Sequence, residues 1–451
     1  MTSSPATARA FATVLVALDT LVLLAVFNVL AAVRGLVSPG SLLLAPYLLP
    51  LGFLLVGLYL IDGYRLRTDM LSLAYTSEHL IALGCVLLAL LFVTFALLTE
   101  FSLLKQSRAV TALGFAVLAP LTLGYRRLLY LRFTRGRHER TFLFVGRQSE
   151  FAGFAADFAA SGLSQRLAAL PTDGLDATAL RDRLFAAIAR DRDRLDGVIL
   201  RESNLELPGD AAERLVALHF AGLPIYTLEI FHEAFWRRIP LYRLGQVWLL
   251  QEGFDVAREP AYERAKRLCD VLAAAAVLVL ALPLWLLVPL AIRMCDGRPV
   301  LFRQTRIGLN RRPFTLVKFR TMRPVTDVAA PSAGAAARVT PLGRWLRQTR
   351  LDELPQLWNV LKGDMSLIGP RAEWTQLVAD YEKSIPCYHF RHLVRPGITG
   401  WAQVNQPHGS GRDDTMRKLE YDLYYLRHFS FRLDASIVLK TIHTMLFGQG
   451  R

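Results

Sequence analysis

Two adjacent carboxylates near the C-terminal end of the chain stand in strongly basic surroundings. Asp352 and Glu353 come just before a stretch of helical pattern, and Arg344, Arg347 and Arg350 precede them. A carboxylate among arginines is expected to keep a low pKa and to lie where phosphate groups bind. Aspartate is an established type of nucleophile on phosphorus, and a neighbouring acid with Mg²⁺ can handle the proton and the charge. The residue types therefore indicate chemistry on a phosphorylated substrate.

A structural interpretation of the same residues is also open. Thr349 and Asp352 have the spacing of a helix capping box, and acidic residues are common in the first turn of a helix. The wider sequence favours chemistry, because Lys318 and Arg320 lie in an upstream basic segment and Arg371 follows a tight turn downstream. The carboxylate pair by itself does not distinguish the two interpretations.

Cysteine and histidine usage does not indicate a zinc site. The four cysteines form no C-x-x-C pair and no paired Cys/His spacing, so neither a structural zinc site nor a disulfide framework is expected. His389, His392 and His408 form only a loose group. They are interpreted as core or surface residues rather than as ligands.

The composition and the long apolar stretches indicate a membrane protein. The 451 residues are 53% hydrophobic with a net charge of +15, which predicts two or three domains and a partner that is nucleic acid, an anionic membrane or a phosphorylated molecule. Apolar stretches fill the first third of the chain at 11–33, 42–61, 79–98 and 110–125. Each is near the ~20 residues that cross a bilayer and is apolar on all sides. We expect a four-helix transmembrane bundle, with Pro120 inside its shortest helix.

The loops of this predicted bundle carry their positive charge unevenly. Six arginines lie within residues 126–140, and Arg65 and Arg67 follow the second stretch. Because positive loops stay in the cytoplasm, both ends of the bundle are expected to face it. Asp19 lies inside the first stretch, where an acid is a functional hypothesis by default. The interpretation adopted is that Asp19 reaches the interface from near the start of the helix.

A fifth apolar run extends over 271–292 and has basic residues at both ends. Lys266 and Arg267 precede it and Arg293 follows it, which fits poorly with a single crossing of the membrane. Pro283 stands in its middle and removes a helical hydrogen bond, which favours a bend. A re-entrant helix, which enters and returns on the same side, is therefore favoured over a spanning one.

The region between residues 136 and 255 has the pattern of a soluble α/β domain. Strand-like and helical patterns alternate in the order 141–145, 150–160, 177–190, 198–200, 211–220 and 224–228. This alternation predicts a small parallel sheet of Rossmann type. Gly146 is followed by Arg147 and Gln148, and the second and third glycines of the dinucleotide fingerprint are missing. A structural or regulatory use of the domain is therefore favoured over dinucleotide binding.

Four motifs occur in one order in the last part of the chain. They are FRQTRIG at 302–308, KFRTM at 318–322, TRLDELPQLWNVLKGDMSLIGPR at 349–371 and VRPGITGWAQV at 394–404. With them the chain strongly resembles the bacterial sugar transferases, which are polyprenyl-phosphate hexose-1-phosphate transferases. The resemblance is close over about 260–451. The segments before residue 260 resemble those of the large, membrane-anchored members of this family. The C-terminal sequence resembles that of the exopolysaccharide-biosynthesis branch.

The resemblance implies a reaction and assigns residues to it. Asp352 would attack the β-phosphorus of a UDP-sugar and release UMP, and undecaprenyl phosphate would then take the phosphosugar from the aspartate. Glu353 would assist the acceptor or Mg²⁺, and both acids are candidate Mg²⁺ ligands. The residues that match phosphate-binding or substrate-binding positions are Lys318, Arg320, Arg347 and Arg371. The bent apolar run matches the re-entrant helix of the family, for which the structural residues are Lys266, Arg267 and Pro283.

Together these expectations describe a multidomain membrane enzyme. Residues 1–135 would form the four-helix transmembrane bundle, 136–255 the α/β Rossmann-like domain, and 256–451 a mainly α catalytic domain with a re-entrant helix at about 266–293. Its partners would be a UDP-sugar, undecaprenyl phosphate and the lipid bilayer, without nucleic acid, and a homodimer is compatible with the sequence. The expected location is the bacterial inner membrane, with the catalytic domain facing the cytoplasm.

Two other classes of protein stay open from the sequence. A membrane nucleotide-sugar dehydratase can also join four helices to a Rossmann domain, and Tyr262 and Lys266 have the Y-x-x-x-K spacing of that chemistry. These two residues lie outside the α/β region and lack a glycine fingerprint, which weighs against that class. A non-catalytic membrane scaffold or sensor would use the middle domain for a regulatory ligand. It would not need the basic residues around Asp352 and Glu353.

Overall fold

The computed structural model describes residues 5–36, 38, 43–66, 68–97, 108–134, 140–163, 165–201, 209–241, 259–323, 338–406, 409 and 411–447. The chain divides into two units, Met1–Arg237 and Arg238–Arg451, and each is described by itself. The predicted boundaries after residues 135 and 255 both lie outside the described residues. The division into three domains therefore stays a prediction.

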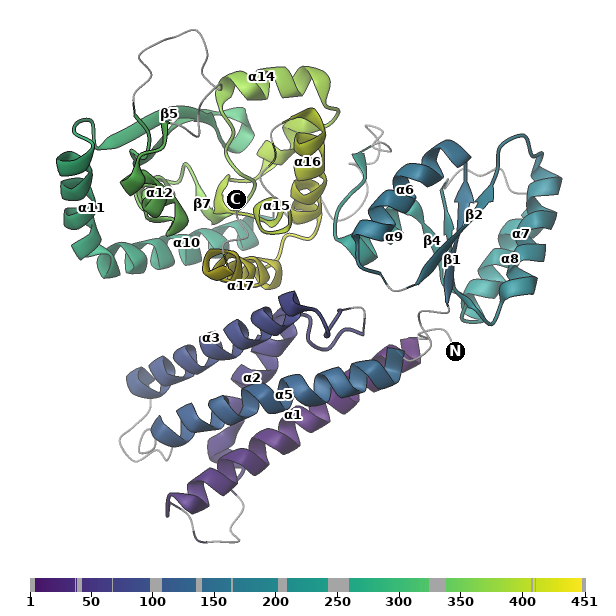
Figure 1. The fold of residues 1–451 in the computed structure, drawn as a ribbon, viewed down its shortest axis with the longest axis horizontal. Helices are drawn as coiled ribbons and strands as arrows, with labels where there is room; N and C mark the ends of the chain where they lie inside the picture. Colours follow the sequence, from purple (N-terminus) through teal and green to yellow (C-terminus); the bar gives the residue numbers. More distant parts are fainter. Residues whose placement is uncertain are drawn as a thin grey trace. The chain divides into compact units, whose positions relative to one another are not determined.

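The first unit begins with apolar helices (Figure 1). Three of them contain stretches that are long and apolar enough to cross a membrane: α1 (Pro5–Val33), α3 (Leu73–Leu97) and α5 (Arg108–Thr134). The predicted second helix consists of the turn η1 (Ala45–Tyr47) and α2 (Leu48–Leu60), and it is shorter than a span. Pro120 lies inside α5 without ending it. Apolar N-terminal helices are therefore confirmed, and three of them reach spanning length.

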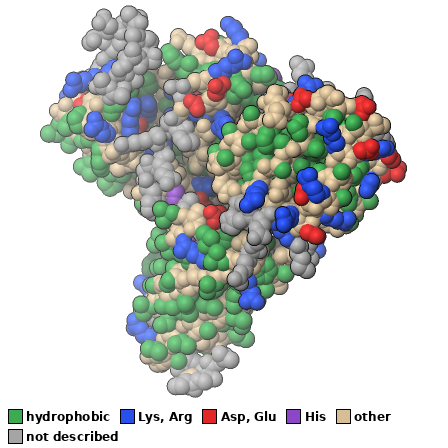
Figure 2. Space-filling view, turned by 45° about the vertical axis from the view of Figure 1, so that its right-hand side comes forward, with side chains coloured by type: hydrophobic (Ala, Val, Ile, Leu, Met, Phe, Trp, Pro, Cys, Tyr) green, Lys and Arg blue, Asp and Glu red, His purple; other side chains and the backbone are tan. Residues whose placement is uncertain are grey.

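The outer surface of these helices is apolar. Figure 2 shows hydrophobic side chains over most of the lower part of the view, where the helices lie. Leu21 and Val29 on α1, Leu88 and Phe92 on α3 and Leu128 on α5 are each at least 60% exposed. A contiguous apolar surface of this kind marks contact with lipid or with a partner. Together with the length of the helices, it indicates a protein anchored in a membrane.

Asp19 takes part in a buried ion pair inside these helices. Its carboxylate and the guanidinium of Arg126 on α5 are both fully buried, with N–O distances of 2.7 and 2.6 Å. The hydroxyl of Tyr64 donates to the same carboxylate at 2.7 Å, and the hydroxyl of Tyr125 donates to it as well. Asp19 is therefore buried between helices and is not exposed on their surface. Its charge is compensated inside the bundle, and the pair ties α1 to α5.

A four-stranded parallel sheet follows in the first unit. Its strand order is β2 (Arg166–Pro171), β1 (Thr141–Gly146), β3 (Leu195–Leu200) and β4 (Ile225–Thr227). The connecting helices are α6 (Gln148–Ala160), α7 (Ala177–Asp191) and α8 (Gly209–Phe220), and α9 (Leu228–Phe231) and the π-helical turn η3 (His232–Trp236) follow β4. The predicted strands are present, but β2 was missed. It is a partly exposed edge strand without β-branched residues, so it lacks the usual composition of a strand.

The start of α6, directly after β1, is the position at which a dinucleotide-binding domain holds its ligand. The backbone N–H of Gln148, at the start of α6, donates to the carboxylate of Asp173 at 2.7 Å. In a dinucleotide-binding domain this helix start receives the pyrophosphate. Here a carboxylate of the chain itself occupies the helix start, which agrees with the missing glycines after Gly146.

The second unit begins with the apolar run that was predicted to bend. α10 (Pro260–Leu280) and α11 (Leu282–Cys295) meet at Ala281 with a bend of 64°. The break comes two residues before Pro283, because Pro283 cannot donate to the carbonyl of Val279 and its ring would collide with that carbonyl. Apolar side chains stay exposed on both helices, for example Leu280 at 82% and Leu286 at 76%. Both a broken span and a re-entrant helix have this geometry.

An antiparallel hairpin follows the bent helices in the second unit. The hairpin consists of β5 (Leu301–Ile307), the turn η7 (Leu309–Arg311) and β6 (Pro313–Phe319). It is followed by α12 (Pro341–Gln348), η9 (Leu351–Glu353), α13 (Gln356–Lys362), β7 (Ser366–Ile368), α14 (Thr375–Ser384), η10 (Tyr388–Leu393), β8 (Gly397–Thr399), α15 (Trp401–Asn405), α16 (Arg412–Arg427) and α17 (Phe431–Phe447). β7 and β8 pair in parallel. Ala274 of α10, Leu316 of β6 and Val360 of α13 share one apolar core, which fixes the hairpin against both helices.

Candidate active site

Asp352 lies in a short turn between two helices. Thr349 caps the end of α12 by donating its hydroxyl to carbonyl oxygens of the last turn, and η9 then carries Asp352 and Glu353. The capping-box interpretation is therefore wrong, because Thr349 closes the preceding helix and not the start of α13. Arg350 has a left-handed φ of 58°, a conformation that costs energy for a residue other than glycine. The backbone is thus strained two residues before Asp352.

Three predicted phosphate-binding residues come together at this turn from different elements. Lys318 lies near the end of β6, Arg347 in the last turn of α12, and Arg371 after β7. Lys318 and Arg347 act electrostatically on Asp352, and Arg371 acts on Lys318. Among the described residues, the Lys318 ammonium and the Arg371 guanidinium have no hydrogen-bond or ion-pair partner, and Arg347 donates only to Thr321, at 2.9 Å. Unused cationic donors around a carboxylate fit phosphate binding.

Burial reverses the expectation for the pKa of Asp352. The residue is only 5% exposed. Burial, followed by the charge of Glu353, raises the pKa of Asp352 to about 6, although Lys318, Arg347 and Arg350 oppose the shift. The expectation of a low pKa is therefore wrong, because desolvation outweighs the neighbouring cations. A carboxyl group with this pKa is still ionised at neutral pH, and such perturbed groups are typical of functional sites.

The cations of the site are themselves partly desolvated. Burial lowers the pKa of Lys318, while the charge of Asp352 opposes this shift. Burial and the charge of Arg371 likewise lower the pKa of Arg306, which lies on β5 and donates to the carbonyl of Ala372 at 2.9 Å. Arg306 is a fourth cation of the site that was noted in the sequence only as part of a motif. Its place in the FRQTRIG motif was the available indication.

Arg320 does not join this group. Its guanidinium donates to the backbone carbonyl oxygens of Asp296, Gly297 and Arg298. The side chain is buried there and connects the end of β6 to the end of α11. The structure thus gives Arg320 a structural contact and does not place it with the phosphate-binding candidates.

The two adjacent carboxylates fit one kind of metal site. Glu353 accepts a hydrogen bond from Arg350 at 3.2 Å, and Asp352 has no such partner among the described residues. Mg²⁺ is commonly held by one or two carboxylates, with phosphate oxygens and waters as its other ligands. In the described part of the chain there is no group of three or more His, Cys, Asp and Glu residues that could hold a metal. The donor set therefore fits a Mg²⁺ that shares its ligands with a phosphorylated substrate.

A buried network holds the backbone at Arg371. Arg391 of η10 donates to the carboxylate of Asp422 on α16 at 2.7 and 3.0 Å and to the hydroxyl of Tyr388 at 2.7 Å. The same guanidinium donates to the carbonyl oxygen of Arg371 at 3.1 Å. The sequence did not single out Arg391 or Asp422 as functional, because only the folded chain places them behind Arg371. Their contacts assign them a positioning role.

Asp422→Ala is expected to destabilise the second unit by about 3 kcal/mol, because it leaves the buried Arg391 charge without its counter-ion. Tyr388→Phe removes one neutral partner of the same guanidinium and should cost only about 1 kcal/mol. Thermal unfolding of the purified protein in nanodiscs, followed by tryptophan fluorescence, measures both effects. An Asp422→Ala protein as stable as wild type would contradict the network.

Asp352→Asn is expected to stabilise the protein at pH 7.5 by up to about 3 kcal/mol. The pKa of about 6 in the folded state lies above the ordinary value of about 3.9, so ionisation of Asp352 costs stability as the pH rises from about 4 to about 6. The gain should therefore shrink between pH 6 and pH 4, where the carboxyl group becomes protonated in both states. Unfolding midpoints at several pH values test this, with the exposed Asp380→Asn as the control. A gain that is independent of pH would refute the cause given.

Lys266 and Arg267 anchor α10 to the rest of the second unit. The Lys266 ammonium and the Asp434 carboxylate of α17 form a buried ion pair at 2.6 Å. Arg267 donates to the carbonyl oxygens of Val360 and Leu361 at the C-terminal end of α13. These contacts agree with the predicted structural role of both residues. They also fix α13, whose other end follows the Asp352 turn.

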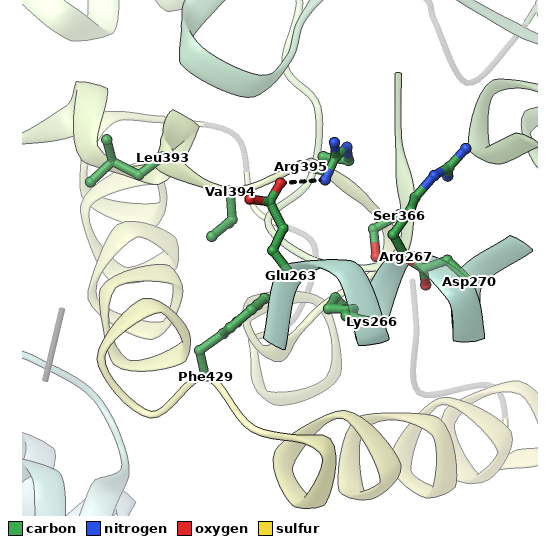
Figure 3. A pocket seen from close by; sticks show the side chains of 9 residues that line it. All are labelled: Glu263, Lys266, Arg267, Asp270, Ser366, Leu393, Val394, Arg395 and Phe429. Carbon is green, nitrogen blue, oxygen red and sulfur yellow. Dashed lines mark hydrogen bonds and ion pairs between the residues drawn. The ribbon is translucent and has the colours of Figure 1, made fainter. Parts of the chain in front are cut away.

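Figure 3 shows the small cavity beside these two residues, where Glu263 of α10 pairs with Arg395 at 2.6 Å. The cavity has a volume of about 20 Å³, which is room for about one water molecule. It is therefore not a substrate site. Tyr262 packs on Phe429 and Phe431 nearby. Since Lys266 is held in an ion pair, the Y-x-x-x-K spacing reflects anchoring and gives no support to a dehydratase.

Comparison with known proteins places the chain in a family. The model of the family described as "Bacterial sugar transferase" matches residues 261–448, a range that includes every residue of the site. The UDP-N-acetylgalactosamine-undecaprenyl-phosphate N-acetylgalactosaminephosphotransferase of Aeromonas hydrophila is 39% identical over 57% of this chain and 60% of its own. The UDP-glucose:undecaprenyl-phosphate glucose-1-phosphate transferase of Caulobacter vibrioides is 44% identical over 45% of this chain and 76% of its own.

A third relative is covered almost completely. An uncharacterized sugar transferase of Bacillus subtilis is 42% identical over 41% of this chain and 89% of its own length. The 451-residue chain described here therefore belongs to the bacterial sugar transferase family, as its motifs predicted. The matched part of the chain covers 60% of the length of the Aeromonas protein, and 36% and 40% of the lengths of two further relatives.

Proposed function

We propose that this protein is a membrane-anchored polyprenyl-phosphate hexose-1-phosphate transferase. It moves a sugar 1-phosphate from a UDP-sugar to undecaprenyl phosphate and so starts a lipid-linked exopolysaccharide. The observation that carries the proposal is the buried carboxylate of Asp352 near Lys318 and Arg347, with Arg371 near Lys318. The cationic donors of these three residues are largely unused. The names of the relatives, which act on UDP-linked sugars and undecaprenyl phosphate, support the choice of substrates.

In the first step, a carboxylate oxygen of Asp352 attacks the β-phosphorus of the UDP-sugar. A new O–P bond forms, the bond from the β-phosphorus to the bridging oxygen breaks, and UMP leaves with that oxygen. Lys318, Arg347 and Arg371 stabilise the charge that builds up on the phosphoryl oxygens. Because Lys318 is partly desolvated before substrate binds, little solvent around it must reorganise during the reaction.

In the second step, a phosphate oxygen of undecaprenyl phosphate attacks the same phosphorus. The bond to Asp352 breaks, the carboxylate is regenerated, and the product is an undecaprenyl diphosphosugar. Glu353 assists this step by holding or accepting a proton near the acceptor. When bound at Asp352 and Glu353, Mg²⁺ would neutralise part of the diphosphate charge.

The rest of the chain brings this chemistry to a membrane surface. We propose that α1, α2, α3 and α5 form a four-helix transmembrane bundle of residues 1–135, that residues 136–255 form a Rossmann-like domain, and that residues 256–451 form the catalytic domain. The bend at Ala281 and the basic residues at both ends of the apolar run support a re-entrant helix. The proposed location is the bacterial inner membrane with the site facing the cytoplasm, where a UDP-sugar is present. A homodimer is compatible with this arrangement.

One experiment tests the proposed function. Membranes that contain the protein are incubated with undecaprenyl phosphate, Mg²⁺ and radiolabelled UDP-glucose or UDP-N-acetylgalactosamine. Formation of UMP and of a labelled lipid diphosphosugar, which disappears on addition of a chelator, is the expected result. A protein that binds these substrates but forms no lipid product would instead be a non-catalytic sensor.

The release of UMP in the absence of acceptor is expected to depend on pH with an apparent pKa near 6. Below that value the carboxyl group of Asp352 becomes protonated, so the rate should fall about tenfold for each pH unit. The diphosphate of a UDP-sugar stays ionised over this range and does not contribute. Because Asp352 and Glu353 lie next to each other, the measured value belongs to the pair. A rate that stays constant between pH 7.5 and pH 5 would contradict the assignment.

A further inference from the structure

One face of the β5–β6 hairpin extends the site beyond the phosphate-binding residues. In an antiparallel pair, residues directly opposite each other lie on the same face, and neighbours along a strand alternate between faces. Phe302 is paired directly with Lys318. Phe302, Gln304 and Arg306 therefore share one face of the hairpin with Lys318, and Thr305 lies on the other face.

Phe302 places an exposed aromatic ring beside a half-buried cation. The Lys318 ammonium lies 5.3 Å from the centre of the Phe302 ring, and Phe302 is 39% exposed. Aromatic rings are mostly buried in folded proteins, because their area contributes strongly to the core. An exposed ring next to cationic groups is the combination with which proteins stack a nucleic-acid base while they hold its phosphate.

Gln304 adds hydrogen-bonding groups to the same face. It is half-buried, and its amide has no hydrogen-bond partner in the part of the chain that the structure describes. A primary amide offers both a donor and an acceptor, which matches the alternating C=O and N–H groups on the edge of uracil. Alternate residues of a strand are about 7 Å apart, so one base can contact both Phe302 and Gln304.

We propose that Phe302 and Gln304 bind the uracil base of the donor nucleotide and determine its specificity. This inference rests on the proposed function, since it takes a nucleoside diphosphate sugar as the donor. Phe302 stacks on the base, Gln304 hydrogen-bonds to its edge, and the adjacent Lys318 binds the diphosphate near Asp352. The polyprenyl chain of the acceptor is the other occupant that an exposed ring could contact, and the experiment separates the two.

The experiment measures the binding of UMP and of inorganic pyrophosphate by calorimetry on the full chain in nanodiscs. Phe302→Leu keeps an apolar side chain without the aromatic ring, and it should weaken UMP binding about tenfold while pyrophosphate binding stays unchanged. Phe302→Tyr should stay within about twofold of wild type, since the ring is retained. Gln304→Leu should weaken binding of UMP but not of CMP. Thr305→Ala, on the opposite face of β5, is the matched control and should bind UMP like wild type.

The outcomes separate this inference from the proposed function. Unchanged UMP binding in Phe302→Leu overturns the base site, even if wild type turns over UDP-sugars normally. A Phe302→Leu protein whose KM rises only for undecaprenyl phosphate assigns the ring to the lipid chain and also overturns it. If wild type binds UMP through Phe302 but transfers no sugar phosphate, the base site stands and the proposed function fails.

Discussion

Asp352→Asn should lower the release of UMP from a UDP-sugar by a factor on the order of 10⁴ or more. The carboxamide has the same shape as the carboxyl group but offers no anionic oxygen to attack phosphorus. The substitution also removes a buried carboxylate whose ionised form is disfavoured by desolvation. The variant should therefore fold and have a higher free energy of unfolding than wild type. Loss of activity together with a gain of stability is the combined result that distinguishes a catalytic carboxylate from a structural one.

Two matched variants sharpen this test. Asp380→Asn removes an exposed carboxylate of α14 in the same unit, and it should leave the rate unchanged. Asp352→Glu keeps the charge but moves it by about one bond length, which is expected to cost about 100-fold because attack on phosphorus needs precise placement. An Asp352→Asn protein that retains a tenth of the wild-type rate would exclude Asp352 as the nucleophile.

Lys318→Met should lower the rate of the first step by about 10² to 10³. The Lys318 ammonium is partly desolvated and has no ion-pair partner among the described residues, so its charge is available to the phosphoryl oxygens. Methionine keeps much of the length and the apolar stem of the side chain. Because Lys318 holds down the pKa of Asp352, its removal should also move the acid limb of the pH profile to higher pH. A merely structural lysine would not produce that shift.

Lys362→Met is the control for the loss of one positive charge. Lys362 is exposed at the C-terminal end of α13, whereas the Asp352 turn precedes the other end. Steady-state kinetics and the pH profile of UMP release should match those of wild type in this variant. Equal losses in Lys318→Met and Lys362→Met would show that only the overall charge of the unit matters.

The elements of the fold could be predicted where one physical property decides the structure. The length of the apolar stretches located the N-terminal helices, and Pro283 located the bend between α10 and α11 to within two residues. β2 was missed because it contains no β-branched residue and so lacks the usual composition of a strand. The burial of Asp19 was also missed, because its partner Arg126 is 107 residues away and belongs to another helix.

The geometry of the candidate site could be predicted only in part, and the chemistry of its residues stays a prediction. The motifs indicated Lys318, Arg347 and Arg371, and the fold brings these three to the Asp352 turn. The positive charge of these residues suggested a low pKa for Asp352. The burial of Asp352, which raises its pKa, depends on how the turn packs and cannot be read from the sequence. Arg320 lies only two residues from Lys318 and yet binds backbone carbonyls elsewhere. Arg391 and Asp422 became recognisable only from their contacts at Arg371.

The proposed mechanism requires a covalent intermediate on Asp352, which mass spectrometry can detect. Purified protein is mixed with UDP-glucose or UDP-N-acetylgalactosamine without acceptor, quenched in acid and digested with trypsin. Cleavage after Arg350 and Lys362 gives a peptide of residues 351–362 that contains both Asp352 and Glu353. The predicted result is one sugar phosphate on Asp352, which is absent in Asp352→Asn and lost when undecaprenyl phosphate is added. An adduct on Glu353, or UMP release that requires the acceptor and leaves no adduct, would contradict the mechanism.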